Sequence, residues 1–414
     1  MKVCLVSKAD SFGGGASRVA EELTDLLLRN GYGAQHWSSW AGKGYSDIRL
    51  PLYGHFERYV RAAHTASKKY MALPETIPFE LPFFFRRNRW KQFNLFHFHD
   101  ISSAISPLTL LTLSRLRPTV WTIHDCSPFT GGCLYPMGCE RYKTGCGSCP
   151  QKGEWPLDTP VDFSRLWRAL KHGVHAVGRI TLITPSQWMA DMAMSSGMLH
   201  ERPTVIPNGV DTALYTPGDK AELRKEFGLP EDRHVVLLTA GHIKDTRKGV
   251  VYALQALRSV SHLKPVVLLV GAMDDSARPM FSGMEVFPTG YIGDPAKLAR
   301  AYASSDLLLF CSQAENMPLT VLETMACGVP TLAFSVGGVP EIIKQNETGM
   351  VVPLGDVKAL SKALDYALTS GILPEWGQNA RSRAETVYSY KQLLDAHIGL
   401  YEKLIEKSFF QGTV

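Results

Sequence analysis

Short runs of apolar and β-branched residues alternate along this chain with longer stretches in which apolar residues recur every three or four positions. The short runs are typical of buried parallel strands, and the longer stretches of the helices that connect them. This alternation predicts an α/β fold with two doubly wound sheets. The strands are expected at 3–7, 93–97, 120–123 and 181–184 in the first half, and at 235–239, 265–270, 286–290, 307–310 and 331–334 in the second.

The break between the two halves is expected near Pro207-Asn208-Gly209, where a proline and an Asn-Gly pair end one unit before a polar stretch begins the next. With 414 residues the chain is too long for one ordinary core, so two lobes of similar size are the natural arrangement. We predict an N-terminal lobe over 1–205, a second lobe over 206–375, and helices over 376–414 that pack back onto the first lobe.

Composition and charge limit the class of protein. Hydrophobic residues make up 45% of the chain and charged residues 20%, and the net charge of +5 is too mild and dispersed to indicate a nucleic-acid partner. The first apolar run breaks after six residues without a cleavage site, which favours a strand over a signal peptide. No stretch approaches the roughly 18 apolar residues of a membrane span. We therefore expect a cytoplasmic protein.

One local segment differs from the rest of the surface pattern. At 82–91, in PFFFRRNRWK, three phenylalanines adjoin four cations and a tryptophan. Such a segment suits an anionic membrane surface, or an acceptor that carries phosphate and lipid. A packed strand end with a solvated flank explains it equally well. Peripheral membrane contact is thus one of two interpretations.

Two turns in the first half are candidate ligand sites. Gly14 and Gly15 lie in SFGGGAS between a strand and a helix, where glycine lets the backbone approach a ligand and the helix start favours a phosphate or a sugar hydroxyl. His124 ends a predicted strand, at the edge where open α/β sheets bind ligands. A tight turn and a structural histidine are the alternatives, and His97 and His99 follow the same pattern as His124.

A cationic turn occupies the corresponding place in the second half. His242, Arg247 and Lys248 lie in GHIKDTRKG, after a strand and before a helix expected over 250–261. Cations there can neutralise a diphosphate and stabilise a departing nucleotide without a metal ion. A solvent-facing turn is the alternative, but Gly249 at the helix start favours a ligand site.

The most specific motif is a pair of glutamates in ENMPLTVLE, with Glu315 in a loop and Glu323 in the first turns of the next helix. The two carboxylates could bracket one ligand, Glu315 at a sugar hydroxyl and Glu323 at the hydroxyls of a ribose. Backbone N–H groups between them would favour a diphosphate. A surface helix with two acidic residues would not explain the stretch that follows at 324–330, or the second glycine turn at 336–341. The candidates between the glutamates are Asn316, Met317, Pro318, Leu319 and Thr320.

Five of the eight cysteines lie between positions 126 and 149. A cytoplasmic chain seldom keeps structural disulfides, so metal binding comes ahead of bridges. Cys146 and Cys149 form a C-x2-C pair, and Cys133 and Cys139 could complete a four-thiolate zinc site that staples a long loop. Free thiols or a regulatory disulfide explain the cluster about as well.

Together these motifs resemble the family-4 retaining glycosyltransferases of GT-B fold. The resemblance spans nearly the whole chain and rests on the glutamate pair with Gly-Val-Pro behind it, the Arg-Lys-Gly turn, the glycine-rich first turn, Thr-Pro-Ser at 184–186 and Pro-Asn-Gly-Val-Asp at 207–211. It implies two facing Rossmann-like lobes with an interlobe cleft, the second holding a nucleotide-sugar donor, UDP- or GDP-linked, and the first an acceptor. It also implies front-face, metal-independent transfer to a hydroxyl of a glycan or lipid-linked saccharide. The cysteine loop is similar to that of polysaccharide-assembly members.

Carried over by position, the resemblance implies that Glu323 binds ribose, Glu315 the donor sugar and Lys248 the phosphates. Gly14 would allow the backbone to approach the donor, and His124 would contact the sugar near its anomeric carbon. One departure concerns the phosphate site, because many members carry an arginine several residues ahead of the Lys-Gly pair, where this chain has His242 and Lys244. Arg247 is expected to serve instead.

Two other functions fit part of the pattern. A nucleotide-sugar epimerase of the same fold would surround the sugar with acidic and histidine side chains for proton abstraction. The Arg-Lys-Gly turn, together with the glutamate pair, favours transfer over the epimerase. A non-catalytic protein that binds a sugar nucleotide would not explain so many ligand-directed motifs in one cleft.

Overall fold

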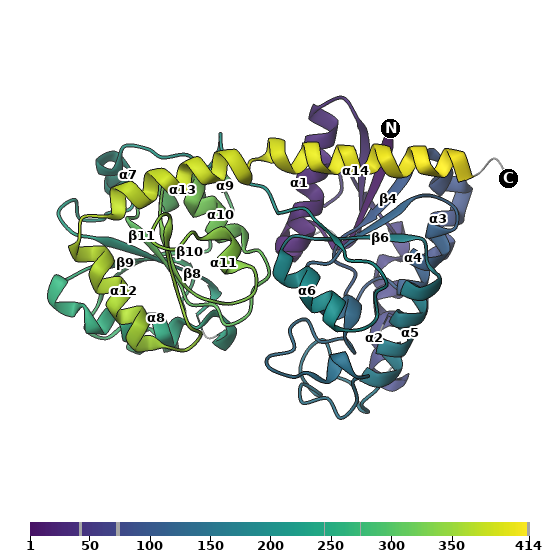
Figure 1. Cartoon of the computed structure of the whole chain (residues 1–414), viewed down its shortest axis with the longest axis horizontal. Helices are drawn as coiled ribbons and strands as arrows, with labels where there is room; N and C mark the ends of the chain where they lie inside the picture. The colour runs from purple at the N-terminus through teal and green to yellow at the C-terminus, as the bar shows by residue number, and fades with distance from the viewer. Residues whose placement is uncertain (41–43, 72–74, 244, 274, 412–414) are drawn as a thin grey trace. The chain divides into compact units, whose positions relative to one another are not determined.

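The computed structural model describes residues 1–40, 44–71, 75–243, 245–273 and 275–411, and of His242, Met71 and 409–411 the backbone alone. The chain forms two compact units (Figure 1). The first unit comprises Met1–Pro207 and the described residues from Leu394 onward, and the second comprises Asn208–Leu393.

The sheet of the first unit has seven parallel strands in the order β3-β2-β1-β4-β5-β6-β7. The order reverses between β1 and β4, so the loops that follow these two strands open at the point where doubly wound sheets bind ligands. The strands are β1 Lys2–Ala9, β2 Gly33–Trp40, β3 Arg49–Pro51, β4 Leu95–Phe98, β5 Thr119–Thr122, β6 Ile180–Thr184 and β7 Thr204–Val205.

Helices cover this sheet because their apolar faces match its buried strands. Val3, Leu5 and Val6 of β1 are fully buried, as expected for a strand covered on both faces. In the first helix Val19 and Leu23 are buried on one side. The helices are α1 Gly15–Arg29, α2 Glu57–Met71, α3 Leu81–Phe85, α4 Pro107–Ser114, α5 Ser164–Val177 and α6 Gln187–Ser195.

The second unit repeats this plan around six parallel strands in the order β10-β9-β8-β11-β12-β13. Its order reverses between β8 and β11, so the loops after these strands meet at one edge of the sheet. The strands are β8 Val235–His242, β9 Val266–Ala272, β10 Glu285–Gly290, β11 Leu307–Phe310, β12 Thr331–Phe334 and β13 Gly349–Val352. The helices are α7 Lys220–Glu226, α8 Val250–Ser259, α9 Pro295–Ala303, α10 Leu319–Ala326, α11 Val339–Ile342, α12 Val357–Thr369 and α13 Leu373–Val387.

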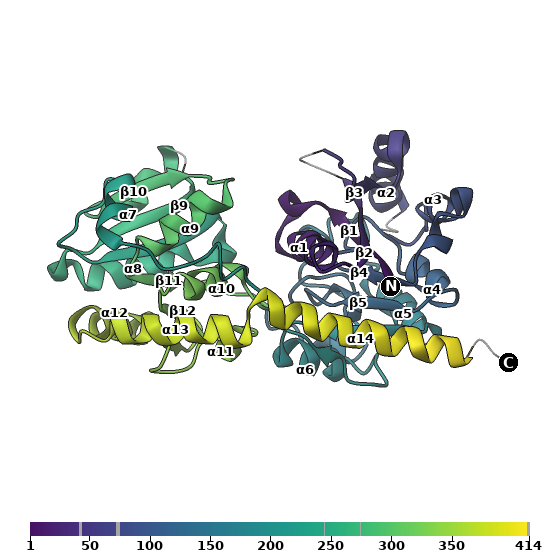
Figure 2. The ribbon, with the colours of Figure 1, turned by 90° about the horizontal axis from the view of Figure 1, so that it is seen from above.

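The last helix, α14 Tyr390–Gln411, belongs to both units. Its first residues group with the second unit, where Tyr390 N donates to Val210 O at 3.1 Å. From Leu394 onward it groups with the first unit, beside β4 (Figures 1 and 2), and Tyr401 is fully buried there. A segment at the end of the chain thus completes the core of the unit built from its beginning.

The expected α/β fold with two Rossmann-like units is confirmed, and the nine expected strands are present with ends shifted by a few residues. Sequence patterning missed β2, β3, β7 and β13. The second strand reads GAQHWSSW, so its polar residues hide the apolar run, although His36 and Ser38 are buried. The expected strand end at 82–91 is instead helix α3 followed by the turn Arg86–Gln92.

Candidate functional site

An ion pair joins two of the predicted ligand residues in the second unit. Lys248 Nζ lies 2.7 Å from Glu315 Oε1, and the two side chains are 26% and 12% exposed. Lys248 follows β8 and Glu315 follows β11, and these two strands are neighbours in the sheet. The topology therefore brings a cation and a carboxylate from positions 67 residues apart to one edge of the sheet.

The turn that carries Lys248 is fixed by its own caps. Asp245 accepts a hydrogen bond from Arg247 N at 3.0 Å and begins the 3₁₀ turn Thr246–Lys248. Gly249 ends the turn with φ 64°, and a Cβ there would lie 2.0 Å from Cys311 O in the loop after β11. Only glycine fits this close approach of backbones. Gly249 thus packs two loops together, and in doing so it positions Lys248. Its expected place at a ligand site stays a prediction.

The guanidinium group of Arg247 lies near a different carboxylate from the one that pairs with Lys248. Its Nη2 lies 3.6 Å from Asp245 Oδ2, and its side chain is 41% exposed. Its carbonyl oxygen accepts from Gln313 N at 2.8 Å, which ties the turn to the loop after β11. The structure therefore holds Arg247 next to Lys248 in the chain but does not pair it with Glu315. The side chain of His242 and the whole of Lys244 lie outside the described residues.

The loop that carries Glu315 is supported from two directions. Asn208 Nδ2 donates to Met317 O at 3.0 Å. Gly337, with φ 54°, lies so close that a Cβ there would meet Glu315 O at 1.6 Å, and Gly338 N donates to Asn316 O at 2.9 Å. The second glycine turn of the sequence thus has a packing role beside the glutamate loop. Asn208 also supports this loop. In the sequence it had indicated only the boundary between the two halves of the chain.

The helix α10 begins directly after this loop. Pro318 is its N-cap residue and provides no side-chain cap, so the N–H groups of the first turn, from Leu319 and Thr320, are not capped by a side chain. A helix start of this kind favours a negatively charged ligand group. Glu323 lies one turn further along and is 3% exposed, and Asn316 and Met317 are also buried. The structure leaves the expected bracketing of one ligand by Glu315 and Glu323 untested.

In the first unit, the glycine-rich turn forms an uncapped helix start. Gly14 is the N-cap residue of α1 with φ 115° and ψ 176°, and a Cβ there would meet nothing within 4 Å. The conformation therefore favours glycine although space does not demand it. Gly15 is the first residue of α1, and both glycines are exposed. The expected approach of a ligand to the backbone of this turn stays a prediction.

His124 lies two residues beyond the end of β5 and is half-buried. Its Nε2 lies 3.0 Å from His99 Nδ1, and the two rings stack with centroids 5.3 Å apart. Burial lowers the pKa of His124 to about 3 and the pKa of His99 well below its usual range. Both imidazoles are therefore neutral near pH 7, and each can offer one donor and one acceptor nitrogen.

His97 and His99, which were not assigned to the site from the sequence, belong to one buried network with His124. His97 is hydrogen-bonded to Thr122 Oγ1 at 2.7 Å and to the hydroxyl of Tyr401, on α14, at 2.5 Å. Its ring lies 4.1 Å from the ring of His99. His97 lies in β4 and His99 just beyond its end. This spacing was the feature of the sequence that could have indicated the network. The network links α14 to the side chain that contacts His124.

Charged side chains surround the residue after His124. Lys8 Nζ lies 2.7 Å from Asp100 Oδ2, and burial, reinforced by the nearby Asp100 carboxylate, raises the pKa of Asp125. Asp125 accepts a hydrogen bond from Ser127 N at 2.7 Å. None of these three charged residues was predicted as a site residue, although His124-Asp125 adjoin in the sequence.

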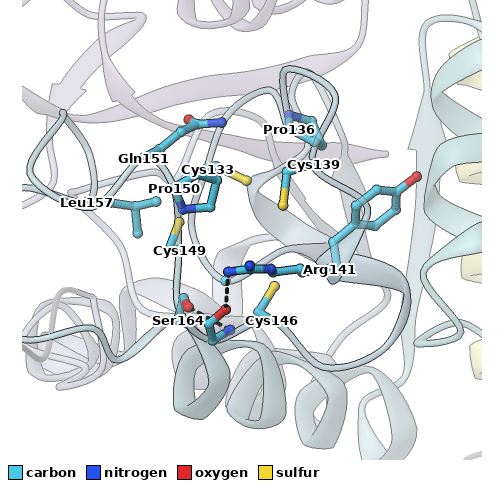
Figure 3. A pocket seen from close by; sticks show the side chains of 13 residues that line it. Cys133, Pro136, Cys139, Arg141, Cys146, Cys149, Pro150, Gln151, Leu157 and Ser164 are labelled. Carbon is cyan, nitrogen blue, oxygen red and sulfur yellow. Dashed lines mark hydrogen bonds between the residues drawn. The ribbon is translucent and has the colours of Figure 1, made fainter.

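The four cysteines predicted to bind zinc line one pocket in the long loop between β5 and α5, with Gly131, Pro136 and Tyr142 among its other residues. Figure 3 shows their side chains around a common space that the side chain of Arg141 crosses. All four are free thiols, and burial raises the pKa of Cys133 to about 11. Among the described residues no group of three or more His, Cys, Asp and Glu is arranged to hold a metal ion.

Family models match both units. The model described as Glycosyltransferase Family 4 matches residues 13–214, and the model described as Glycosyl transferases group 1 matches residues 219–383. Within the described residues, no helix is long and apolar enough to cross a membrane.

Among similar sequences, a protein of Escherichia coli K12 provisionally named colanic acid biosynthesis glycosyl transferase WcaC is 27% identical over 94% of this chain and 97% of its own length. N-acetyl-α-D-glucosaminyl L-malate synthase of Bacillus anthracis is 27% identical over 47% of this chain and 52% of its own length.

Among solved structures, the sucrose-phosphate synthase of Thermosynechococcus elongatus covers 98% of this chain and 99% of its own, with a TM-score of 0.67 and 19% identity. HepE of Anabaena, solved in complex with UDP-glucose, covers 98% of this chain and 100% of its own, with a TM-score of 0.66 and 16% identity. At these identities the two structures bear on the fold alone.

Proposed function

The chain belongs to the family-4 glycosyltransferases of GT-B fold, and on that premise we propose that it transfers a sugar from a nucleotide-sugar donor to a hydroxyl of a glycan or lipid-linked saccharide during polysaccharide assembly. We propose that transfer retains the configuration of the sugar and needs no metal ion. The similarity to WcaC supports a role in polysaccharide assembly, and we propose that the donor is a UDP- or GDP-linked sugar. Two glycosyltransferase models across both units do not favour an epimerase or a non-catalytic binding protein.

The observation that carries the proposal is the ion pair of Lys248 with Glu315. Both side chains are part-buried and stand on loops fixed by hydrogen bonds and by glycines. A cation held in this way needs little reorganisation when charge develops on a departing diphosphate. The uncapped start of α10 favours the same charge. In our proposal the donor diphosphate binds Lys248 and the start of α10, and the donor sugar takes Glu315 as a hydrogen-bond acceptor.

The neutral state of His124 supports front-face transfer. An imidazole whose pKa is near 3 is a weak base, so it suits a hydrogen bond to a sugar hydroxyl better than removal of the acceptor proton. In the proposed step the bond from the anomeric carbon to the phosphate oxygen breaks, and the acceptor oxygen bonds to the same face of that carbon. The acceptor proton passes to the departing phosphate, which becomes the leaving nucleoside diphosphate.

The test is a panel of UDP- and GDP-sugars that follows the melting temperature of the protein and the slow hydrolysis of each donor. One donor should raise the melting temperature, because a ligand that binds the folded state stabilises it. Lys248→Ala should lower turnover about 100-fold, the usual cost of losing one group that stabilises transition-state charge. Lys297→Ala, at an exposed lysine of α9, is the matched control. Normal turnover in Lys248→Ala would refute the role of this lysine.

The cysteine pocket carries a second part of the proposal, a structural zinc ion bound by Cys133, Cys139, Cys146 and Cys149. Four thiols lining one pocket, with one C-x2-C pair, fit the ligand chemistry of Zn²⁺. Because the described residues do not stand in a metal-binding arrangement, binding would have to draw the four sulfur atoms together. Metal binding would also need thiolate ligands, and burial raises the pKa of Cys133, Cys146 and Cys149, which disfavours their thiolate forms.

The third part of the proposal is peripheral contact with an anionic membrane through the segment 82–91. Phe84 packs inward, fully buried with its ring centroid 5.3 Å from that of Trp37, whereas Phe85 is exposed. The charges of the segment remain outside, since Arg86, Arg87 and Lys91 are exposed. Clustered cations on one surface attract anionic phospholipids. A lipid-linked acceptor would be reached most easily by an enzyme that rests on the membrane.

A further inference from the structure

A large pocket opens in the first unit at the carboxyl edge of its sheet, apart from the residues assigned above to the donor. The empty volume of the pocket, counted together with the solvent space at its open mouth, is ≈ 1440 Å³. Its walls come from the ends of β1 and β2, from one side of α2, from the loop after β4 and from the loop around Trp155. Substrates of open α/β sheets bind at this edge.

Two exposed tryptophans line this pocket. Trp40 is 36% exposed and Trp155 is 54% exposed. Large aromatic rings left in contact with water in a hollow are typical of a binding site, because a ligand that covers them removes apolar surface from water. The flat ring face matches the C–H face of a pyranose, whose hydroxyls stay in contact with polar groups at the rim.

Cations accompany both rings. Lys8 Nζ lies 5.3 Å from the centre of the Trp155 ring, and Arg61 Cζ lies 5.8 Å from the centre of the Trp40 ring. Lys68 and Lys69, on the same helix as Arg61, also line the pocket.

The lining therefore has four cations, against the carboxylates of Glu75 and Asp158. Lys8 pairs with Asp100 at 2.7 Å, Arg61 with Glu57 at 3.7 Å, and Lys68 with Asp158, so much of this charge is compensated. Burial raises the pKa of Glu75, which favours its neutral form and reduces the negative charge of the wall. The pocket thus combines an excess of positive charge with aromatic faces.

We propose that this pocket binds an anionic saccharide, a sugar that carries a phosphate or a carboxylate group, as part of the acceptor. The inference rests on the proposed transfer of a sugar, and it names the acceptor's chemical class. Trp155 and Trp40 cover the sugar rings, and Arg61 and Lys69 attract the anionic group. A neutral saccharide makes the ring contacts alone and binds more weakly.

The experiment measures binding of glucose 1-phosphate, glucuronate and methyl glucoside to the full chain by calorimetry. At least one anionic sugar should bind about tenfold more tightly than the neutral one, and the two anionic probes distinguish phosphate from carboxylate. Trp155→Ala should weaken binding of all three probes about tenfold. Lys69→Gln should remove much of the preference for the anionic probe while leaving binding of methyl glucoside unchanged.

Tyr59→Ala is the matched control, because Tyr59 is an exposed aromatic residue of α2 with Arg58 Cζ 4.6 Å from its ring, and it does not line the pocket. It should leave binding of every probe unchanged. Melting temperatures show whether each variant is folded. Equal affinity for the three probes, absence of binding, or wild-type binding by Trp155→Ala overturns the inference.

Donor hydrolysis separates this inference from the proposed function. Trp155→Ala should hydrolyse the donor at the wild-type rate while losing the saccharide, because Trp155 is not among the residues assigned to the donor. A wild-type protein that hydrolyses donor but does not bind anionic saccharides refutes the pocket alone. A protein that binds the saccharides but neither binds nor hydrolyses a donor refutes the proposed function alone.

Discussion

At the scale of single residues, the first unit contains several buried histidines held in the neutral form. Burial lowers the pKa of His36, His64 and His175 to about 4 and the pKa of His124 to about 3. An unfolded histidine has a pKa near 6.5. Between the two values the unfolded chain binds more protons than the folded chain, so the free energy of unfolding falls as the pH drops below about 6.5 and is fully retained above it.

We therefore predict that the first unit loses stability between about pH 6.5 and 4, by up to about 1.4 kcal/mol per pH unit for each such histidine. Hydrogen exchange at each pH would measure the loss unit by unit. In the second unit the pKa of His234 is raised, mainly by its hydrogen bond to Asp306. Protonation of His234 at low pH therefore stabilises that unit. His175→Phe should flatten the pH dependence, and His262→Phe, at an exposed histidine, should not. Equal acid sensitivity of both units would contradict this explanation.

Residue types at strand ends allowed part of the site to be predicted from the sequence. The pairing of Lys248 with Glu315 follows once β8 and β11 are neighbours, because the two residues lie in the loops after those strands. Asn208 and His99 were not assigned, because their roles depend on partners more than 20 residues away in the chain. A pattern read along the sequence does not reveal which side chains meet across a sheet.

At the scale of elements, the turn between β8 and α8 depends on one glycine. A side chain at position 249 would need φ 64° and would collide with Cys311 O. We predict that Gly249→Ala costs about 1–3 kcal/mol of stability, the range for a strained backbone position, and also lowers turnover because Lys248 moves with the turn. Chemical unfolding and donor hydrolysis would measure the two effects.

The control for that prediction is Gly293→Ala, since the nearest atom to a Cβ there lies 3.4 Å away in the Tyr291 ring and the backbone needs no left-handed conformation. It should leave both measurements close to wild type. If Gly249→Ala were as stable and active as Gly293→Ala, the close approach of the two loops would have no part in positioning Lys248.

The loop between β5 and α5 gives a prediction for the proposed zinc. Purified protein should contain about one zinc ion per chain, and chelation should lower its melting temperature. Cys146→Ser should lose the metal. Cys126→Ser is the control, because this thiol lies in the same loop but does not line the pocket, so metal content should stay unchanged even though its burial makes some loss of stability expected. A metal-free protein with unchanged melting would refute the zinc site.

The elements missed by patterning have a common physical cause. The expected strands are continuous apolar runs such as Leu307–Phe310, whereas β2 places His36 and Ser38 in buried positions where they are hydrogen-bonded or covered by neighbours. Ser7 Oγ, for example, lies 2.7 Å from His36 Nε2. Buried polar residues look like surface residues in the sequence, so the pattern cannot recognise the strand that carries them.

At the scale of the whole molecule, association with a membrane would be a property of the first unit. We predict that the protein sediments with phosphatidylglycerol vesicles, not with phosphatidylcholine vesicles, and is released by high salt. The double substitution Arg86→Gln with Arg87→Gln should lower the affinity about tenfold or more, since each surface cation contributes about 1 kcal/mol. Arg29→Gln with Arg58→Gln, two exposed arginines elsewhere in the unit, is the control. Equal binding to both kinds of vesicle would exclude an electrostatic contact.

The helix α14 has a consequence for how the protein is made. Tyr401 fills a fully buried position beside His97, yet it lies 304 residues further along the chain. Residues 1–207 of the first unit are therefore translated well before α14, the helix that closes its core. The core of this unit stays incomplete until the whole second unit has been translated. A fragment that ends at Pro207 would expose this face permanently. Nascent chains stalled before residue 394 should thus depend on chaperones more than the finished protein does.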